Sequence, residues 1–190
     1  MTVFGTARAE AIVWARETAE RGDVLYLDTE TTGLGDTDEL VDIAAIDNRG
    51  RILLNTLIKP RRPIPADATA IHGISNFSVR DAPVWAEVYP RFLELVSGYQ
   101  HLIVYNADFD QRLIRQTCFA CALTLPHVSW HCAMKKYAAF VGARGSYGDF
   151  RWHQLGQAVS QLGINLIPDH SALADARACR AVVQGMAAAG

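Results

Sequence analysis

The fold is decided by Val24-Leu25-Tyr26-Leu27-Asp28-Thr29-Glu30-Thr31-Thr32-Gly33. This stretch begins as a short apolar run of the kind that forms a buried strand. Asp28 and Glu30 follow two residues apart, a spacing that points both side chains to one face of a strand. Two carboxylates held so close repel each other unless a cation lies between them, and their hard oxygen atoms suit Mg²⁺ or Mn²⁺. The alternative is a strand end whose two acids simply face water.

Length and composition are typical of a soluble globular protein. We expect one domain over residues 1–190, with an N-terminal helix at about residues 6–21 preceding its core. Apolar residues make up 50% of the chain and charged residues 20%. No apolar run reaches the roughly 20 residues that cross a bilayer, and the acids near the N-terminus are unlike a signal peptide. The sequence therefore predicts a cytoplasmic protein that does not contact a membrane.

The net charge of −2 argues against a broad electrostatic footprint for duplex DNA. Nucleic acid is still a possible ligand, because a metal ion in an acidic site meets a phosphate with its own positive charge. We expect weak and local binding, so a processive enzyme of this composition would need a partner.

The four cysteines are Cys118, Cys121, Cys132 and Cys179. Cys118-x-x-Cys121, with histidines following it, suggests zinc, but the gap between the ligand pairs is far shorter than in zinc fingers. Buried, reduced thiols are the default for an intracellular protein.

Apolar periodicity and turn signals predict secondary structure along the whole chain. Strands are expected at residues 24–28, 39–47, 51–58, 101–105 and 128–132. Helices are expected at residues 7–20, 66–71, 83–95, 108–121, 133–140, 152–162 and 172–186. The helix at residues 108–121 should bury Phe109, Leu113, Ile114 and Phe119, and residues 142–148 should form a glycine-rich loop or surface arm.

This order of elements indicates an α/β domain with a mixed central sheet. The first three strands should form an antiparallel meander, because a tight-turn signal at Asn48-Arg49-Gly50 joins the second to the third. The end of the first strand and the beginnings of later helices should cluster at one edge of the sheet, where ligand sites commonly lie.

Two further stretches place acids where they can join the first pair. Asp108 and Asp110 open the helix that follows the strand at residues 101–105. Asp108 fits an ordinary N-capping acid, so Asp110, one turn inside, is the better candidate to face the strand end. His170 and Asp175 lie five residues apart, with Asp175 on the last helix. A lone pair of this kind is usually found on the surface without a function, so it indicates a site only together with the other acids.

Four motifs occur in order: Asp28-Thr-Glu-Thr-Thr-Gly33, Ile71-His72-Gly73-Ile74, Asn106-Ala-x-Phe-Asp110 and His170-x4-Asp175. Together they resemble the DEDDh 3′→5′ exonuclease family, in particular the proofreading epsilon subunits of bacterial replicative polymerases, over about residues 24–183. The resemblance implies a ribonuclease H-like fold, with a mixed five-stranded sheet and helices on both faces. It places metal ligands on Asp28, Glu30, Asp110 and Asp175, and the general base on His170. The implied cofactors are two divalent cations, Mg²⁺ or Mn²⁺.

The resemblance also suggests where the terminal nucleotide binds. The backbone of Thr31, Thr32 and Gly33 and the ring of His72 would contact it. The other binding candidates are Ile71, Asn106 and Phe109, although residues such as Ile71 and Phe109 are more often plain core residues. Further aromatic residues should be core or surface anchors: Phe77, Trp85 and Trp152. Four cations either follow backbone phosphates or form a solvated face: Lys135, Lys136, Arg144 and Arg151.

The expected function is therefore a metal-dependent 3′→5′ exonuclease that releases nucleoside 5′-monophosphates from single-stranded DNA. Two metal ions would activate water and stabilise the leaving oxygen, and imidazole accepts protons at neutral pH. The alternatives are an RNA-trimming exoribonuclease with the same site, and a proofreading or adaptor subunit bound to a polymerase. DNA is favoured over RNA as the partner strand. A catalytically dead binding module is disfavoured, because all five site residues are present.

Overall fold

The computed structural model describes residues 3–145 and 149–189. Residues 146–148 of the expected glycine-rich arm lie outside the described residues, while Arg144 and Phe150 on either side of them form an isolated antiparallel bridge. No helix among the described residues is both long and apolar enough to cross a membrane.

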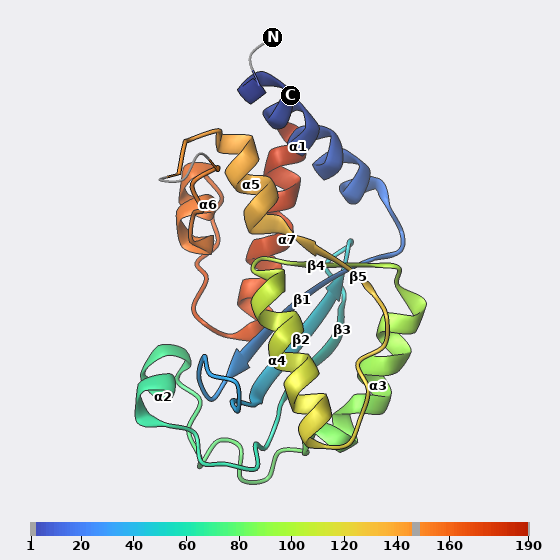
Figure 1. The fold of residues 1–190 in the computed structure, drawn as a ribbon, viewed down its shortest axis with the longest axis vertical. Coiled ribbons are helices and arrows are strands. Elements are labelled where there is room, and N and C mark those ends of the chain that lie inside the picture. Colours follow the sequence, from blue (N-terminus) through green and yellow to red (C-terminus); the bar gives the residue numbers. More distant parts are fainter. Residues whose placement is uncertain (1–2, 146–148, 190) are drawn as a thin grey trace.

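A five-stranded sheet lies at the centre of the molecule (Figure 1). Its strands are β1 (Val24–Thr31), β2 (Leu40–Asp47), β3 (Ile52–Leu57), β4 (His101–Val104) and β5 (Ser129–Cys132). The order across the sheet is β3-β2-β1-β4-β5; β1, β2 and β3 pair antiparallel, while β4 and β5 add in parallel. The predictions of an antiparallel meander and of a mixed five-stranded sheet are both confirmed.

The first strand is longer than its apolar run suggested. Pairing with β2 continues past Asp28, with Glu30 opposite Asp42 and Thr31 opposite Leu40, and a bulge lies between Glu30 and Thr31. The two acids therefore lie within the central strand, because backbone pairing with a neighbouring strand extends beyond the apolar residues.

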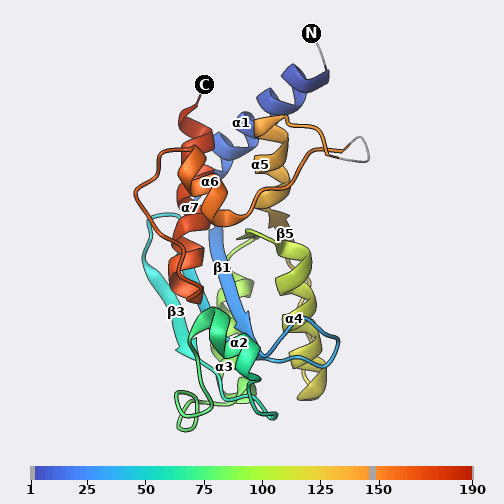
Figure 2. The same cartoon turned by 90° about the vertical axis from the view of Figure 1, so that its left-hand side faces the viewer.

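Helices cover both faces of the sheet (Figures 1 and 2). They are α1 (Val3–Glu20), α2 (Ala66–His72), α3 (Trp85–Gly98), α4 (Ala107–Ala120), α5 (Ala133–Val141), α6 (Leu155–Gln161) and α7 (Ala172–Ala188). Val24 and Tyr26 of β1 pack in one core cluster with residues of α1, α5, α6 and α7. Leu25 and Leu27 pack in a second cluster with residues of α3 and α4. The period of two along β1 thus divides the molecule into two layers of helices.

Two local predictions were wrong. The helix expected from Trp152 begins at Leu155, because Gln154 occupies the N-cap position and its N–H donates to the Gln157 side chain, 3.1 Å away. Trp152 is exposed. Phe119 was expected on the buried face of α4 but is 84% exposed. It follows the buried Cys118 by one residue, a rotation of about 100° that carries it off the apolar stripe.

The turn between β2 and β3 also holds the end of α1. The Asn48 side-chain amide donates to the carbonyl oxygens of Thr18, Ala19 and Arg21 at 2.7, 2.9 and 2.9 Å. The last carbonyl groups of a helix have no partners within the helix, so this single amide satisfies several of them. Gly50 completes the turn with a φ of +82°, which favours glycine.

All four cysteines are free thiols, and Cys118 and Cys179 are buried. The Trp85 indole N–H donates to Cys118 Sγ at 3.3 Å, and Trp85 is a core residue.

Candidate active site

Asp28 and Glu30 continue the row of side chains that begins with Val24 and Tyr26. They lie on the face of β1 that α7 covers, at the end of the strand away from its buried start. Burial raises the pKa of Asp28 well above its ordinary range, and the charges of Asp110 and Asp175 raise it further. Burial also raises the pKa of Glu30 to about 8, with Asp175 as the next cause. Burial and mutual repulsion therefore disfavour the charged forms of these carboxyl groups unless a cation compensates them.

Asp110 reaches the same region from the other layer. Because β4 runs parallel to β1 and leads into α4, the first turn of α4 lies beside the end of β1. Asp110 is 3% exposed, and the Thr29 hydroxyl donates to its Oδ1 at 2.8 Å. Burial raises the pKa of Asp110 to about 7, although the hydrogen bond from Thr29 opposes the shift. Asp108 instead lies on the surface and forms an ion pair with Lys135 at 2.5 Å.

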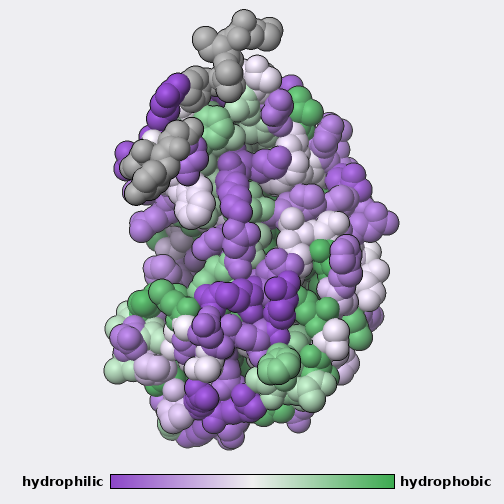
Figure 3. All heavy atoms as spheres, viewed as in Figure 1, coloured by the Kyte–Doolittle hydropathy of each residue, from purple (hydrophilic) through white to green (hydrophobic). Residues whose placement is uncertain are grey.

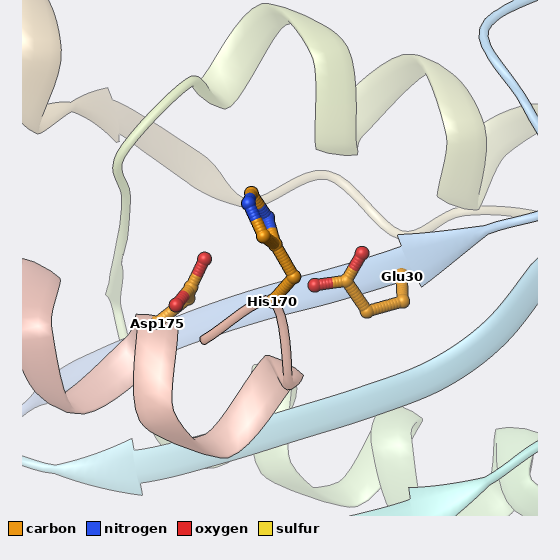
Figure 4. Close-up of side chains that lie close together, drawn as sticks. All are labelled: Glu30, His170 and Asp175. Atoms are coloured by element: carbon orange, nitrogen blue, oxygen red, sulfur yellow. The ribbon is translucent and has the colours of Figure 1, made fainter. Parts of the chain in front are cut away.

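His170 and Asp175 come from the beginning of α7. Ser171 is the N-cap residue and its side chain accepts from Ala174 N at 3.4 Å. His170, just before it, is exposed and has a left-handed φ of +57°. Figure 4 shows the His170 imidazole between the carboxylates of Glu30 and Asp175, and one ligand atom from each of the three lies within 4.8 Å of the others. Residues about 140 positions apart in the chain thus meet at one point.

The donor set of the site fits divalent cations. Four carboxylates and one imidazole offer hard oxygen ligands and a borderline nitrogen. Asp175 Oδ1 is buried and has no hydrogen-bond partner among the described residues, and burial raises the pKa of Asp175. Divalent cations would compensate both features, because they favour the charged form of each carboxylate and accept the free oxygen as a ligand.

The turn after β1 uses its threonine side chains internally. Thr31 Oγ1 donates to the Gly33 carbonyl at 2.8 Å, and Thr32 Oγ1 donates to Asp38 Oδ1 at 2.7 Å. A Cβ atom on Gly33 would lie 2.7 Å from Asp38 Oδ2, so a side chain at this position would displace the Asp38 carboxylate. The hydroxyl groups of Thr31 and Thr32 therefore shape the turn, and a nucleotide contact by this segment falls to its backbone.

His72 ties α2 to the end of β1. Its Nδ1 accepts from Ile74 N at 3.0 Å, so the proton of the neutral ring lies on Nε2, which donates to the Thr31 carbonyl at 3.2 Å. Burial lowers the pKa of His72 and favours this neutral form. Ile71 beside it is 62% exposed, so the core alternative for Ile71 is wrong.

The remaining binding candidates lie at the start of α4. Asn106 is exposed at its N-cap position, and Phe109 is partly buried against the core cluster of α3 and α4. The Arg112 guanidinium lies 5.5 Å from the centroid of the Phe109 ring. Figure 3 shows hydrophilic side chains gathered at the centre of this face of the molecule, over α4, with smaller apolar patches beside them.

Two residues near these acids were not predicted from the sequence: Thr29 and Asp42. Thr29 lies between the two acids of β1 and points to the opposite face, where it holds Asp110. Asp42 lies in β2 opposite Glu30, and its Oδ2 accepts from Ala172 N at 3.2 Å. The sequence did contain one signal for Asp42, which is a carboxylate inside an otherwise apolar strand. A buried carboxylate is costly unless it has a partner.

A mixed five-stranded sheet with Glu30, His170 and Asp175 side by side, and with Asp28 and Asp110 near enough for their charges to interact, matches a class of protein, the nucleases of ribonuclease H-like fold. The model of the exonuclease family (RNase_T) matches residues 25–183. The chain belongs to this exonuclease family, and its resemblance to the DEDDh exonucleases is confirmed.

Two relatives show how widely the domain is used. The chain is 41% identical over 175 residues to an uncharacterized exonuclease, CP81, of Escherichia phage 186. The alignment covers 88% of this chain and 90% of that protein. It is 36% identical over 144 residues to a DNA polymerase III subunit epsilon-like protein of Rhodobacter capsulatus, with 72% of this chain but only 20% of that protein covered.

Solved structures share the fold. Exonuclease X in complex with 5′ overhanging duplex DNA is 27% identical, with a TM-score of 0.64 over 88% of this chain and 93% of that one. Exonuclease I of E. coli in complex with a dA16 oligonucleotide is 20% identical, with a TM-score of 0.69; the match covers 83% of this chain and 39% of that one.

Proposed function

We propose that this chain is a metal-dependent 3′→5′ exonuclease that removes the terminal nucleotide of single-stranded DNA as a 5′-monophosphate. The observation that carries the proposal is the cluster of Glu30, His170 and Asp175, with a buried oxygen of Asp175 that has no partner among the described residues. Asp28 and Asp110 lie close enough for their charges to interact with this cluster. Exonuclease X, whose structure contains DNA, supports DNA as the substrate class.

Four acids would hold the cations: Asp28 and Glu30 of β1, Asp110 of α4 and Asp175 of α7. When bound, two divalent cations supply the positive charge that stabilises the transferred phosphate and the leaving 3′ oxygen. These cations would also allow the four carboxylates to stay ionised together at neutral pH.

In this proposal His170 accepts the proton of the attacking water. Its imidazole lies at the exposed rim of the cluster, where water and a phosphodiester can both reach it. The nearby carboxylates of Glu30 and Asp175 stabilise the imidazolium ion that forms when the ring takes the proton. Thr29 fixes the direction of the Asp110 carboxylate through its hydrogen bond, so the ligand is oriented before a cation binds.

A second candidate role is proofreading in association with a polymerase. The names of relatives, such as the epsilon-like protein of Rhodobacter capsulatus, favour it. Co-purification of the chain with a replicative polymerase tests this role separately from the chemistry.

Digestion of labelled oligonucleotides tests the main proposal. Single-stranded DNA and RNA of one sequence, labelled at the 5′ or the 3′ end, are incubated with Mg²⁺, Mn²⁺ or EDTA. We expect a 5′-labelled DNA ladder that shortens one nucleotide at a time, immediate release of a 3′ label as mononucleotide, and no cleavage in EDTA. Faster digestion of RNA than of DNA would show that RNA is the substrate. Cleavage in EDTA would contradict the metal requirement.

A matched pair of variants on α4 shows whether the cluster is responsible. Asp110→Asn removes a carboxylate of the cluster, whereas Asp108→Asn removes the surface carboxylate that pairs with Lys135. We expect Asp110→Asn to lose cleavage by about 10²-fold or more and Asp108→Asn to keep it. Equal activity of the two variants would contradict the assignment of Asp110.

A further inference from the structure

We propose that Asp42 is a positioning residue, which fixes the beginning of α7 against the sheet and so sets His170 and Asp175 beside the acids of β1. This role of Asp42 rests on the proposed function, because it concerns the position of residues assigned to that reaction.

Asp42 lies in the layer where the site is built. It is paired with Glu30 across β1 and β2, so the two side chains point to the same face of the sheet. Asp42 is 7% exposed, although the strand around it is apolar. A carboxylate in such a place needs a partner that compensates its burial.

That partner is the first residue of α7. Ala172 N donates to Asp42 Oδ2 at 3.2 Å, across 130 positions of the chain, and Ala172 is fully buried. The N–H groups of the first helical turn have no acceptor within the helix, and the positive end of the helix attracts a negative charge. Ser171 caps the helix locally through Ala174 N, whereas Asp42 attaches it to the sheet.

The attachment point lies between the two site residues of α7. His170 is two residues before Ala172, and Asp175 is three residues after it. His170 also holds a left-handed φ that a free loop would relax. A shift of the helix start would therefore displace the imidazole and the carboxylate together, and a displacement of about 1 Å can lower a rate by about 10²-fold.

Two substitutions of similar size separate the hydrogen bond from the charge. Asp42→Asn keeps an oxygen acceptor for Ala172 N but removes the charge, and Asp42→Leu removes both. We expect Asp42→Asn to keep kcat within about threefold, and Asp42→Leu to lower kcat by about 10- to 100-fold with KM little changed. Asp42→Ala serves the same purpose if Asp42→Leu does not fold.

Asp47 supplies the control on the same strand. It is equally buried and accepts from Arg49 N and Arg51 N, both at 2.9 Å, at the turn away from the site. Asp47→Ala should lower the melting temperature and leave kcat unchanged. An equal loss of kcat in Asp47→Ala, or an equal loss in Asp42→Asn and Asp42→Leu, would overturn the positioning role.

Cation binding gives a readout that needs no turnover. We expect the affinity for Mn²⁺, measured by calorimetry, to fall about tenfold in Asp42→Leu and to stay within about threefold in Asp42→Asn. Failure of the parent protein to cleave any strand would contradict the proposed function, whereas unchanged Mn²⁺ affinity in Asp42→Leu would contradict the role of Asp42.

Discussion

His170 is held in a backbone conformation that its side chain does not favour. A left-handed φ costs a residue with a Cβ atom about 1 kcal/mol, and among the described residues other than glycine only Ala122 shares it. Backbone strain of this kind is typical of functional sites, where the surrounding structure enforces it. Here it directs the imidazole to the rim of the acidic cluster.

Replacement of His170 separates the chemistry from the strain. We expect His170→Ala to lower kcat by about 10²- to 10⁴-fold, because the attacking water loses its base. His170→Gly should be equally inactive but more stable than His170→Ala by about 1 kcal/mol, because glycine tolerates the left-handed φ. Cleavage rates and thermal unfolding measure the two effects.

The exposed His127 provides the control for this experiment. His127→Ala should cleave at the parent rate. A His170→Ala variant as fast as His127→Ala would show that another group accepts the proton.

At the residue scale, the sequence singled out acids more readily than the residues around them. Asp28, Glu30 and Asp110 became candidates because a carboxylate beside an apolar strand or at a helix start is conspicuous. Thr29 and Asp42 were missed because their roles depend on what faces them: Thr29 bonds Asp110 across 81 positions, and Asp42 bonds Ala172 across 130. Local spacing contains no information on partners that only the folded sheet provides.

At the scale of elements, periodicity located every strand and helix but not every boundary. The start of α6 depends on Gln154 and Gln157, which form an N-cap without serine, threonine or aspartate. The exposed Phe119 shows that a large apolar residue can lie off the buried stripe of its helix. In both cases the sequence predicted the element, and the details depended on hydrogen bonds and packing.

Asn48 joins two elements, and its removal should weaken both. Asn48→Ala leaves the carbonyl groups of Thr18, Ala19 and Arg21 without their donor. We expect a loss of about 1–3 kcal/mol in the free energy of unfolding, measured by denaturant titration, with kcat unchanged because the turn is far from the acids. Asn55→Ala, on the neighbouring strand β3, is the control. A loss of activity without a loss of stability would contradict this role.

At the scale of the whole molecule, the acidic cluster makes stability depend on pH and on cations. The folded-state pKa values of Glu30 and Asp110, about 8 and about 7, lie above the values near 4 of an unfolded chain. The folded protein thus binds protons more tightly than the unfolded chain. Its stability without metal should fall as the pH rises from about 4 to about 8.

Thermal unfolding in EDTA at pH 5 and pH 8 measures this dependence. We expect a lower melting temperature at pH 8, and a smaller difference in the double variant Glu30→Gln with Asp110→Asn. Added Mg²⁺ should raise the melting temperature more at pH 8, where the ligands are deprotonated. An Mg²⁺ effect equal at both pH values would argue against a carboxylate site.

Both ends of the described chain lie at the same end of the molecule, opposite α2 and far from the acids (Figures 1 and 2). The Arg16 side chain on α1 donates to the Ala187 carbonyl near the end of α7 at 3.0 Å, whereas Asp175 lies in the first turn of α7. A helix of 17 residues spans roughly 25 Å. An affinity tag, dye or resin linkage joined at either end would therefore attach far from Glu30, His170 and Asp175, so an immobilised protein would keep this cluster accessible to oligonucleotides in the bulk solution.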